Sequence, residues 1–561
     1  MNRIYTKYKK AFIQKASCLL VCVLMLLPSL FLKAQTFYGY QGPSIISNTQ
    51  LTSNNSYCIN PNQFNYELVD SILNVSPNSH LQFKYQDFTL SATPFSYISN
   101  VNSTIASGIN LGTLIPNRGN QQLVSLGARL NWKDKISIQL APEFQTADNK
   151  VFAQYPLNST DWDQHYYYLN HIDLPEQQGN LPLKKWYPGQ SYIKYHFTNF
   201  DASLSTENKW WGPANFNPLV LSSNAQGFYH ASFATNKPFV TRIGSFEGEV
   251  ISGVLENSGF YPPETNRISV RLDQTLYEPK KQNSRYITGL IYTYQPKWVP
   301  GLYLGLTKLS MLYKDELSNG LDLLPLEGFF GNKLTPTEAS GRKASMGSWF
   351  LRYTMPSEHA EFYYEYGRND QSLHLGNIFQ QKPYGRAFTA GLKKAFELKP
   401  NYGFLQLGLE ITTLSLPQAS QVYSTPSSWY LDNYVRQGFT NKGKVLGAGI
   451  GPGSNSQTLF LQWMKGMNNV GVRVNRVIHN LDFYHSTHYY LTDHFNQYWA
   501  TVSTTAYFSV SIKKMTLAGE YTWQRDLNYQ WEWYRYTDIG FNNVGNDLFN
   551  HNGRLMLSYR L

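Results

Sequence analysis

The sequence predicts an all-β protein, a transmembrane antiparallel β-barrel, and three observations support this fold class. A secretory leader opens the chain, no second run of about 18 or more apolar residues follows it, and several segments alternate apolar with polar residues. Aromatic residues make up 16% of the 561 residues, including 42 Tyr and 13 Trp. Barrels place Tyr and Trp in girdles at both membrane interfaces, which favours a barrel over a large secreted β-sandwich or β-propeller.

Residues 1–34 have the organisation of a cleavable signal peptide. Basic residues from Arg3 to Lys15 precede an uncharged apolar run from Ala16 to Leu32, and Ala34 is a small residue suited to cleavage. Pro28 and the short length of the run argue against a spanning helix, which needs about 20 apolar residues. We expect export across the inner membrane and cleavage after Ala34.

Cleavage changes both the charge and the cysteine content. The chain has 48 basic and 37 acidic residues, and six of the basic residues lie in the leader, so the net charge falls from +11 to +5. Only Cys58 remains of the three cysteines, which excludes an intramolecular disulfide in the mature chain. We expect no nucleic-acid partner, and we expect stability to come from a closed sheet rather than from disulfides.

The segment from Ser348 to Arg368 shows the strand pattern best. Every second residue from Trp349 to Met355 is apolar or aromatic, residues 356–359 read as a turn, and the alternation resumes from Phe362 to Tyr366. A shift of the pairing by one residue would move every side chain to the other face, so the register of this hairpin is strongly specified. The pattern predicts an apolar lipid face and a polar lumenal face.

The lumenal face of this hairpin carries charges that are predicted to pair. Pairing the strands across the turn opposes Arg352 to Tyr363, so Arg352 lies diagonal to Glu361 and Glu365. Opposite charges on neighbouring strands neutralise each other in the lumen, while the lipid face keeps none.

Further alternating hairpins predict that residues 81–561 form the barrel. Strand pairs flank short connections at 286–309, 388–412 and 508–523, and these tight turns are predicted to lie in the periplasm. The last strand, Arg554 to Leu561, alternates and ends on a hydrophobic residue, which is the kind of terminus that a barrel-assembly machinery is expected to recognise. We expect about 18 strands in all.

Long polar and aromatic segments separate the hairpins near residues 154–185, 314–343, 416–444 and 527–553. Such lengths are unusual in compact soluble domains but routine for the extracellular loops of barrels. Residues 35–80 are rich in Asn and Ser and are predicted to form a small plug or a periplasmic segment. No linker separates a second large domain.

No constellation in the sequence points to catalysis, a metal or a cofactor. The four histidines between His479 and His494 lack supporting cysteines, and strand alternation would place His485 and His488 on opposite faces. Glu361 and Glu365 resemble a glycosidase pair in kind, but lumenal carboxylates more often neutralise basic residues of neighbouring strands. We expect a protein that is not an enzyme and holds no cofactor.

Aromatic clusters in the predicted exterior loops are the candidate ligand-binding residues. They are Trp162, Tyr166, Tyr167, Tyr168, Trp429, Tyr430, Trp531 and Trp533. Flat rings beside Asp, Asn, Gln and His suit sugars, whose C–H faces stack on aromatics while their hydroxyls form hydrogen bonds. An interfacial girdle uses the same residue types without any ligand, and the sequence leaves both interpretations open.

Several short motifs follow one another from residue 209 onward. Trp210, Trp211, Gly212 and Pro213 form a Trp-Gly-Pro element, and a Leu-rich stretch leads from it to Asn224 and Ala225. The later motifs contain Glu365, Gly367, Arg368, Asp370, Gly438 and Gly447. In this order the motifs, which span roughly residues 210–480, resemble those of the Wzi family of capsule-assembly outer-membrane proteins.

The resemblance implies a barrel of eighteen antiparallel strands, closed toward the periplasm by a small helical bundle, that acts as an outer-membrane lectin. Members of the family hold or organise capsular polysaccharide at the cell surface and are not thought to hydrolyse or export it. We interpret the Trp-Gly-Pro element as structural first, because Gly212 and Pro213 end a strand and the two tryptophans anchor that end near an interface.

We therefore predict a monomeric barrel of a Gram-negative outer membrane that binds and organises capsular or other surface polysaccharide. Its other partners would be outer-membrane lipid and, during biogenesis, the barrel-assembly machinery. Weak contacts repeated along one polymer would add up to firm retention. The alternatives are a porin or substrate channel, and an accessory subunit of a secretion or surface-motility machine.

Overall fold

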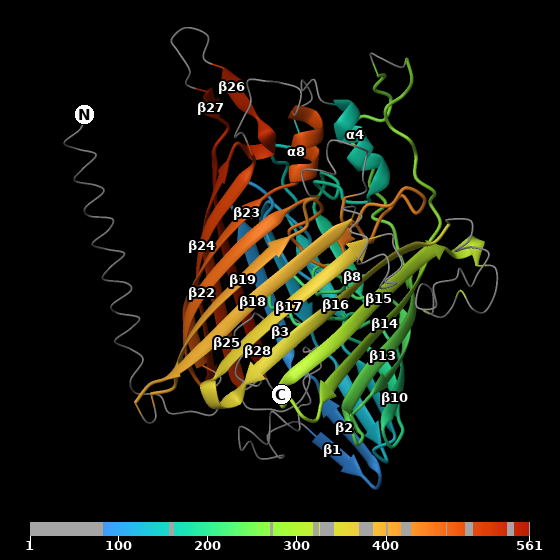
Figure 1. Cartoon of the computed structure of the whole chain (residues 1–561), viewed down its shortest axis with the longest axis vertical. Helices are drawn as coiled ribbons and strands as arrows, with labels where there is room; N and C mark the ends of the chain where they lie inside the picture. The colour runs from blue at the N-terminus through green and yellow to red at the C-terminus, as the bar shows by residue number, and fades with distance from the viewer. Residues whose placement is uncertain are drawn as a thin grey trace.

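The structure is a computed structural model that describes residues 82–155, 162–269, 273–317, 322, 325, 342–369, 385–399, 402–416, 428–466, 468–488, 498–535, 543–559 and 561. The predicted signal peptide (1–34) and N-terminal segment (35–80) lie outside these residues. One antiparallel sheet forms the wall of the molecule (Figure 1).

The strands of this sheet are β1 (Gln82–Tyr85), β2 (Phe88–Ala92), β3 (Phe95–Asn102), β4 (Gly119–Ser125), β5 (Ala128–Trp132), β6 (Ile136–Leu140), β7 (Glu143–Ala147), β8 (Leu183–Tyr187), β9 (Tyr192–His196), β10 (Phe200–Ser205), β11 (His230–Thr235), β12 (Phe239–Val240), β13 (Gly244–Leu255), β14 (Arg285–Pro296), β15 (Leu302–Tyr313), β16 (Ala344–Met355), β17 (Ala360–Asn369), β18 (Arg386–Glu397), β19 (Phe404–Thr413), β22 (Asn455–Lys465), β23 (Asn468–Ile478), β24 (Ala500–Ile512), β25 (Met515–Leu527) and β28 (Leu548–Tyr559). The remaining elements are the hairpins β20 (Thr440–Asn441) with β21 (Lys444–Val445) and β26 (Trp533–Arg535) with β27 (Asn543–Gly545), the helices α4 (Trp162–His171) and α8 (Leu481–His488), and the short turns of 3-10 helix η2 (Lys314–Glu316), η4 (Pro356–Glu358) and η5 (Tyr529–Trp531).

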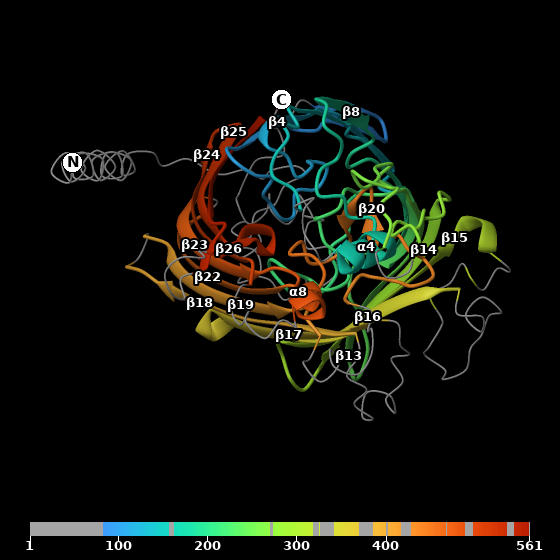
Figure 2. The same cartoon turned by 90° about the horizontal axis from the view of Figure 1, so that it is seen from above.

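The pairing of the strands closes the sheet into a barrel. β2 and β3 are two halves of one long strand, and so are β4 with β5, β6 with β7, and β8 with β9, because both halves of each pair the same neighbouring strands. β28 pairs β25 on one side and β3 on the other, which joins the last strand to the first. β12 continues β11 along β13, and β1 pairs only β2. The 24 strands of the sheet within the described residues therefore reduce to eighteen around the barrel, the expected number. Figure 2 shows the barrel from above.

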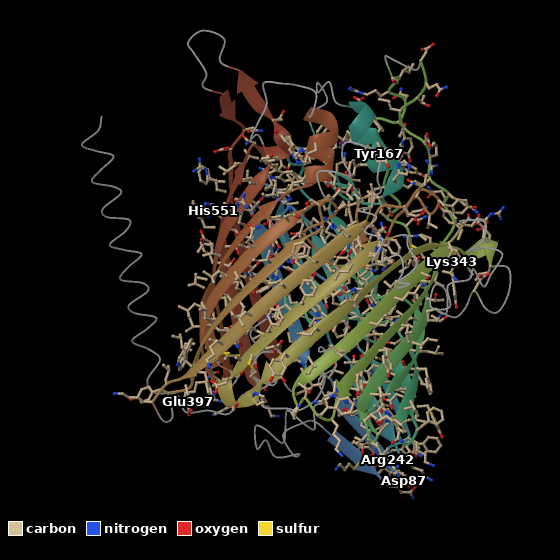
Figure 3. The ribbon with its side chains drawn as sticks, viewed as in Figure 1. Asp87, Tyr167, Arg242, Lys343, Glu397 and His551 are labelled. Carbon is tan, nitrogen blue, oxygen red and sulfur yellow. The ribbon has the colours of Figure 1, made fainter. Side chains whose placement is uncertain are left out.

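The two ends of the barrel differ as the sequence predicts. Short turns join β14 to β15, β16 to β17, β18 to β19 and β24 to β25 at one end. The long connections, α4 and α8 lie at the other end, where Tyr167 is found, whereas Asp87 and Arg242 lie at the end with the short turns (Figures 1 and 3). Barrels have short periplasmic turns and longer extracellular loops, so the end with α4 and α8 is the extracellular end.

The hairpin of β16 and β17 has the predicted register. Arg352 opposes Tyr363 and Met355 opposes Ala360, across a turn that ends at His359 in a left-handed conformation with φ of 47°. Glu361, Tyr363 and Glu365 of β17 are buried toward the lumen, and the residues between them face outward. The side chains of this strand therefore alternate between the two faces with the two-residue period predicted from the sequence.

The outer face of the wall is apolar. Large exposed hydrophobic side chains cover it from strand to strand, including Leu392, Leu407, Leu459, Leu461, Val472, Val474, Phe549 and Leu555. A continuous exposed apolar surface of this size is rare on a soluble monomer and is the lipid-facing band of a transmembrane barrel. Among the described residues, no helix is long and apolar enough to span a membrane.

Two connections fold inward and pack against the lumenal face of the wall at its extracellular half. We call residues 206–229, between β10 and β11, and residues 428–454, between β19 and β22, the plug. Trp211, Leu219, Trp429 and Tyr430 of the plug belong to one buried cluster with wall residues of β13 to β18. The hydrophobic core of this barrel therefore lies inside the cylinder, between the plug and the wall.

Candidate functional site

The wall holds the plug through buried carboxylates, of which Glu410 of β19 makes the most contacts. Its Oε2 accepts the backbone N–H of Asn215 at 2.7 Å and of Phe216 at 3.1 Å, and its Oε1 accepts that of Asn217 at 2.9 Å. The hydroxyl of Tyr363 donates to the same carboxylate at 2.7 Å. Glu410 is 1% exposed, so these donors replace the water that the carboxylate loses.

The Trp-Gly-Pro element lies in the plug and contacts two further carboxylates of the wall. Glu249 of β13 accepts the indole N–H of Trp211 at 3.0 Å and pairs with the ammonium group of Lys209 at 2.6 Å. Gly212 has φ of 104°, and a Cβ there would lie 2.9 Å from Oε2 of Glu365. Only glycine fits this position, because a side chain would collide with the wall in a conformation that L residues rarely adopt.

The other motif residues join the parts of the plug to each other and to the wall. Asn224 donates to the carbonyl oxygen of Val445 at 3.0 Å, and a Cβ at Gly367 of β17 would lie 2.7 Å from the ring of Trp429. A Cβ at Gly447 would overlap the carbonyl oxygen of Leu219 and the hydroxyl of Tyr430.

Three further motif residues occupy the same region. Ala225 is 3% and Arg368 2% exposed, and Gly438 is left-handed with φ of 63°. Asp370 lies outside the described residues. The described motif residues therefore lie in the plug or in the wall beside it, and we interpret their role as structural.

The charged residues of the β16–β17 hairpin form a buried cluster below the plug. The guanidinium of Arg352 lies 3.1 Å from the carboxylate of Glu361, and the ammonium group of Lys393 lies 3.2 Å from it. Glu365 contacts the hydroxyl of Ser348 at 2.6 Å instead. Of the two carboxylates that lie diagonal to Arg352 in the predicted register, the ion pair therefore uses Glu361, while Glu365 faces the plug.

Four of the candidate loop aromatics are buried in the structure. Trp429 and Tyr430 are 0% exposed, and the Tyr430 hydroxyl donates to the carbonyl oxygen of Leu219 at 2.8 Å. Tyr166 and Tyr168 of α4 are also buried, and the Tyr168 hydroxyl lies 2.9 Å from that of Ser428. Their segments turn into the lumen, so these rings build the core of the plug and its cover.

The remaining predicted aromatics lie nearer the surface. Tyr167 is half-buried and its ring lies against His171, with centroids 4.5 Å apart. Trp531 is half-buried and packs on Phe483 with ring centroids 4.6 Å apart. The side chains of Trp162 and Trp533 lie outside what the structure describes.

A group of partly exposed aromatic residues at the extracellular end was missed by the sequence analysis. We call His479, Tyr498, Trp499 and Trp531 the aromatic platform. Trp499 stacks on His479 with centroids 4.0 Å apart and meets Trp531 edge-on at 5.3 Å. Tyr498 and Trp499 stand directly before β24, so their position at the extracellular end of a strand was the signal that could have found them.

The backbone that carries Trp531 is strained. Asn528, Gln530 and Trp531 all have positive φ, at 49°, 57° and 56°. Residues other than glycine adopt this conformation at a cost of about 1–3 kcal/mol each, and such strain gathers at functional sites. This left-handed stretch of backbone carries the Trp531 ring that lies beside Trp499.

Two hollows open on the extracellular half of the molecule, on either side of residues 254–261. The first has about 400 Å³ of empty space, including open solvent, and is lined by Tyr187, Gln190, Thr206, Tyr229, Glu256 and Lys442 among others. The second, of about 290 Å³, is lined by Asp173, Ser258, Phe260, Tyr261, Tyr277 and Lys280 among others. Both combine aromatic rings with hydrogen-bonding groups, the surface that binds sugars.

Two titratable groups in the extracellular loops are shifted by burial. Burial raises the pKa of Glu176 to about 7, although its carboxylate accepts the backbone N–H of Tyr155 at 3.0 Å, which acts in the opposite direction. Burial lowers the pKa of His479 to about 3, so this ring of the aromatic platform is neutral at physiological pH. Neither group faces a reacting centre, and both shifts follow from packing.

Residues 481–488 form the helix α8, so the strand alternation that we applied to His485 and His488 is wrong for this segment. In the part of the chain that the structure describes, no group of three or more His, Cys, Asp or Glu side chains could hold a metal ion.

Comparison with known proteins places these features in a family. The model of the family described as capsule assembly protein Wzi matches residues 113–539. The comparison with curated proteins found no match.

Several solved structures are similar to this chain. The Escherichia coli outer-membrane protein Wzi, involved in group 1 capsule assembly and described as a carbohydrate-binding β-barrel, is 11% identical with a TM-score of 0.54, and the match covers 94% of this chain and 95% of that one. OccAB2 of Acinetobacter baumannii is 10% identical with a TM-score of 0.40, covering 83% and 97%, and OccK7 of Pseudomonas aeruginosa is 9% identical with a TM-score of 0.38, covering 84% and 99%. Since the family model spans well over half of the chain, the protein belongs to the Wzi family of capsule assembly proteins and is a β-barrel of the Gram-negative outer membrane.

Proposed function

We propose that this protein binds capsular or other surface polysaccharide at the extracellular face of the outer membrane and organises it there, without hydrolysing it. Membership of the capsule assembly family supports the proposal, and so does the description of the Escherichia coli Wzi structure as a carbohydrate-binding barrel.

The plug is the single observation that carries this proposal. Glu249, Glu365 and Glu410 hold it from three separate strands of the wall, and its aromatic core packs on the lumenal faces of β13 to β18. A porin needs an aqueous path, which this packing obstructs at the extracellular half. A barrel that is filled in this way is better suited to present an outer surface than to conduct a solute.

The aromatic platform and the second hollow are the surfaces that we assign to the sugar. Trp499 and Tyr498 offer ring faces for C–H stacking, and Lys280, Asp173 and Gln437 at the second hollow offer hydrogen-bonding groups for hydroxyls. Each contact is weak, and repetition along one polymer makes the retention firm. We further propose that the protein acts as a monomer, because its own strands close the ring.

Exchange of the platform rings tests this assignment. Tyr498→Ala combined with Trp499→Ala is expected to weaken binding of purified capsular polysaccharide to the folded protein about tenfold, since each stacked ring contributes about 0.5–1.5 kcal/mol. Trp523→Ala is the matched control, because Trp523 is 43% exposed on the outward face of β25, away from the platform. Equal binding by both variants and the wild type would remove the platform from the site.

Two further measurements separate the proposal from its alternatives. In planar bilayers, the wild-type protein is expected to lack the large steady openings of a porin. Polysaccharide incubated with the protein is expected to keep its chain length. Large steady openings would support the channel, and shortened chains would support an enzyme.

A further inference from the structure

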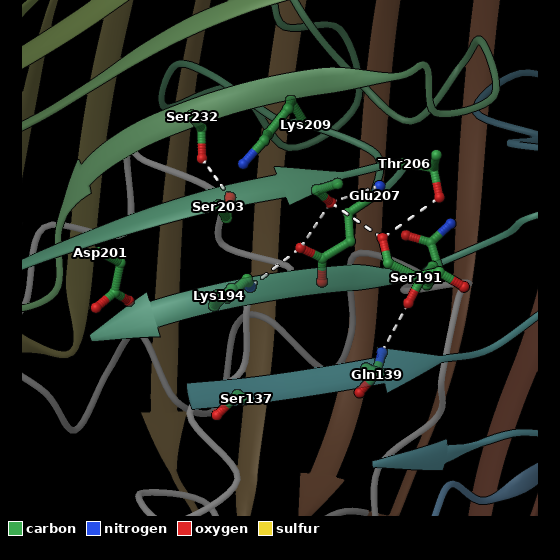
Figure 4. Close-up of polar contacts among 12 residues, drawn as sticks. Ser137, Gln139, Ser191, Lys194, Asp201, Ser203, Thr206, Glu207, Lys209 and Ser232 are labelled. Carbon is green, nitrogen blue, oxygen red and sulfur yellow. Dashed lines mark hydrogen bonds and ion pairs between the residues drawn. The ribbon is translucent and has the colours of Figure 1, made fainter. Parts of the chain in front are cut away.

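The extracellular rim of the barrel has a gap between β8 and the end of β13. β9 pairs β10, but after Ser205 the chain leaves the wall and becomes part of the plug, and it returns only at His230. Thr206 still bonds to the residues that precede β9, to the carbonyl oxygens of Gly189 at 2.7 Å and Ser191 at 2.9 Å; Figure 4 shows Ser191 and Thr206 at this point. We call this gap the rim notch; its sides are Leu183–Tyr187, residues 226–229 and residues 254–256.

The edge of β8 that faces the rim notch pairs no strand within the described residues. β8 pairs β7 along its other edge over its whole length. An unpaired peptide group in hydrocarbon costs several kcal/mol, so open strand edges do not occur among acyl chains. The rim notch therefore lies at the level of the lipid headgroups, which agrees with the exposed Trp186 and Tyr229 beside it, because such rings sit at the membrane interface.

The rim notch carries uncompensated positive charge. Lys184 and Lys185 are exposed, and within the described residues neither has a carboxylate within ion-pair distance. Lys185 pairs with Gln145 of β7, so both side chains face the lumen. Gln145 is 0% exposed, whereas Lys185 is exposed because it lies beside the gap. Its ammonium group is near enough to that of Lys442 for the two charges to repel. An anion between them would relieve this repulsion.

The first hollow opens beside the rim notch. Lys442, which lines it, lies over the ring of Tyr187 at 5.3 Å and 3.0 Å from the carboxylate of Glu256, while Lys185 beside it lies 5.7 Å from the ring of Phe260. One cation, the rings of Tyr187 and Tyr229 and several hydrogen-bonding groups thus line a shallow hollow that is partly open to solvent. A headgroup that carries phosphate on a sugar matches each of these features.

We propose that the rim notch binds the phosphorylated sugar headgroup of an outer-leaflet glycolipid, with Lys184 on the outward face of β8 and Lys185 on its lumenal face each near a phosphate, and with the hollow between Tyr187 and Tyr229 in contact with the sugar. The acyl chains of this lipid lie along the apolar outer wall of β10 and β11, where Leu204 and Phe233 are exposed. This site is separate from the aromatic platform, and it exists whether or not the protein binds capsular polysaccharide.

Native mass spectrometry of the folded full-length protein in detergent tests the proposal, with diphosphorylated lipid A as the probe. The wild type is expected to bind one lipid A, and Lys184→Gln combined with Lys185→Gln is expected to weaken binding about 30-fold, since each basic residue near an anionic lipid surface contributes about a factor of five. Lipid A without its phosphates and phosphatidylglycerol are expected to bind the wild type as weakly as lipid A binds the variant.

The matched control is Lys513→Gln combined with Lys514→Gln, two neighbouring lysines at the periplasmic turn between β24 and β25. This variant is expected to bind lipid A like the wild type. Retention of lipid A by the Lys184 and Lys185 variant, or equal loss in the control, would overturn the proposal. Equally tight binding of a soluble acidic oligosaccharide without acyl chains would show that the rim notch is a polysaccharide site and would overturn it too. A heat-modifiable gel shift checks that each variant is folded.

Discussion

Replacement of Glu410 by Gln is expected to release the plug. The hydrogen-bond partners of this carboxylate are all donors, namely three backbone N–H groups, the side-chain amide of Asn217 and the hydroxyl of Tyr363, so both of its oxygens act as acceptors. Gln offers one oxygen, and its NH2 group then opposes an N–H of the plug. One buried N–H without an acceptor costs about 1–3 kcal/mol, and hydrogen bonds to a charged group contribute about 1.5–3 kcal/mol.

We expect Glu410→Gln to weaken the attachment of the plug by about 3 kcal/mol, which raises the population with a displaced plug about 150-fold. Conductance of the reconstituted protein in planar bilayers measures this population as the fraction of time spent open. Glu520→Gln is the matched control, because Glu520 is a lumenal carboxylate that lies 3.7 Å from Arg554. Unchanged conductance of the Glu410 variant, or equal opening of the Glu520 variant, would show that Glu410 does not hold the plug in place.

Three further perturbations test other contacts. Gly447→Ala is expected to lower the melting temperature in detergent, because its methyl group would overlap Leu219 and Tyr430, whereas Gly553→Ala, with no atom within 4 Å of the new Cβ, should melt like the wild type. Arg352→Met should reduce the free energy of unfolding by about 3 kcal/mol in a denaturant titration, since it leaves Glu361 with Lys393 alone, and an unchanged midpoint would contradict this. Because burial raises the pKa of Glu176 to about 7, the loops around it bind more protons when folded and should lose stability as the pH rises from about 4.5 to about 7. The protection factor of the Tyr155 amide, which corrects the hydrogen-exchange rate for the intrinsic effect of pH, should therefore fall over this range, and Glu176→Gln should abolish this fall.

The wall of the barrel could be predicted from the sequence because its signal is local. A period of two residues, short turns and a polar lumenal face decide the strand and its orientation without any knowledge of distant residues. The register of β16 against β17 follows from one turn and one apolar stripe, and the structure has it as predicted. The number of strands came from the family resemblance, since four of the strands are broken and read as shorter segments.

The plug could not be predicted, because residues 206–229 and 428–454 have no periodicity that distinguishes an inward course from an outward one. Trp429 and Tyr430 stand in a polar and aromatic segment, which is also the composition of an exterior loop. Their burial follows from contacts with Leu219, more than two hundred residues earlier in the chain. Trp499 lay beside a strand end and was overlooked because the aromatic clusters within loops were more conspicuous.

The position of the carboxylates that hold the plug also implies an order in which the parts of the barrel fold. The three carboxylates that hold the plug come from β13, β17 and β19, which do not neighbour one another. These carboxylates therefore reach their final separation only after the intervening strands have paired. Residues 206–229 are synthesised before all three of those strands, yet they cannot make all three contacts until β13 to β19 have paired. We therefore expect this part of the wall to form before the plug takes its final position.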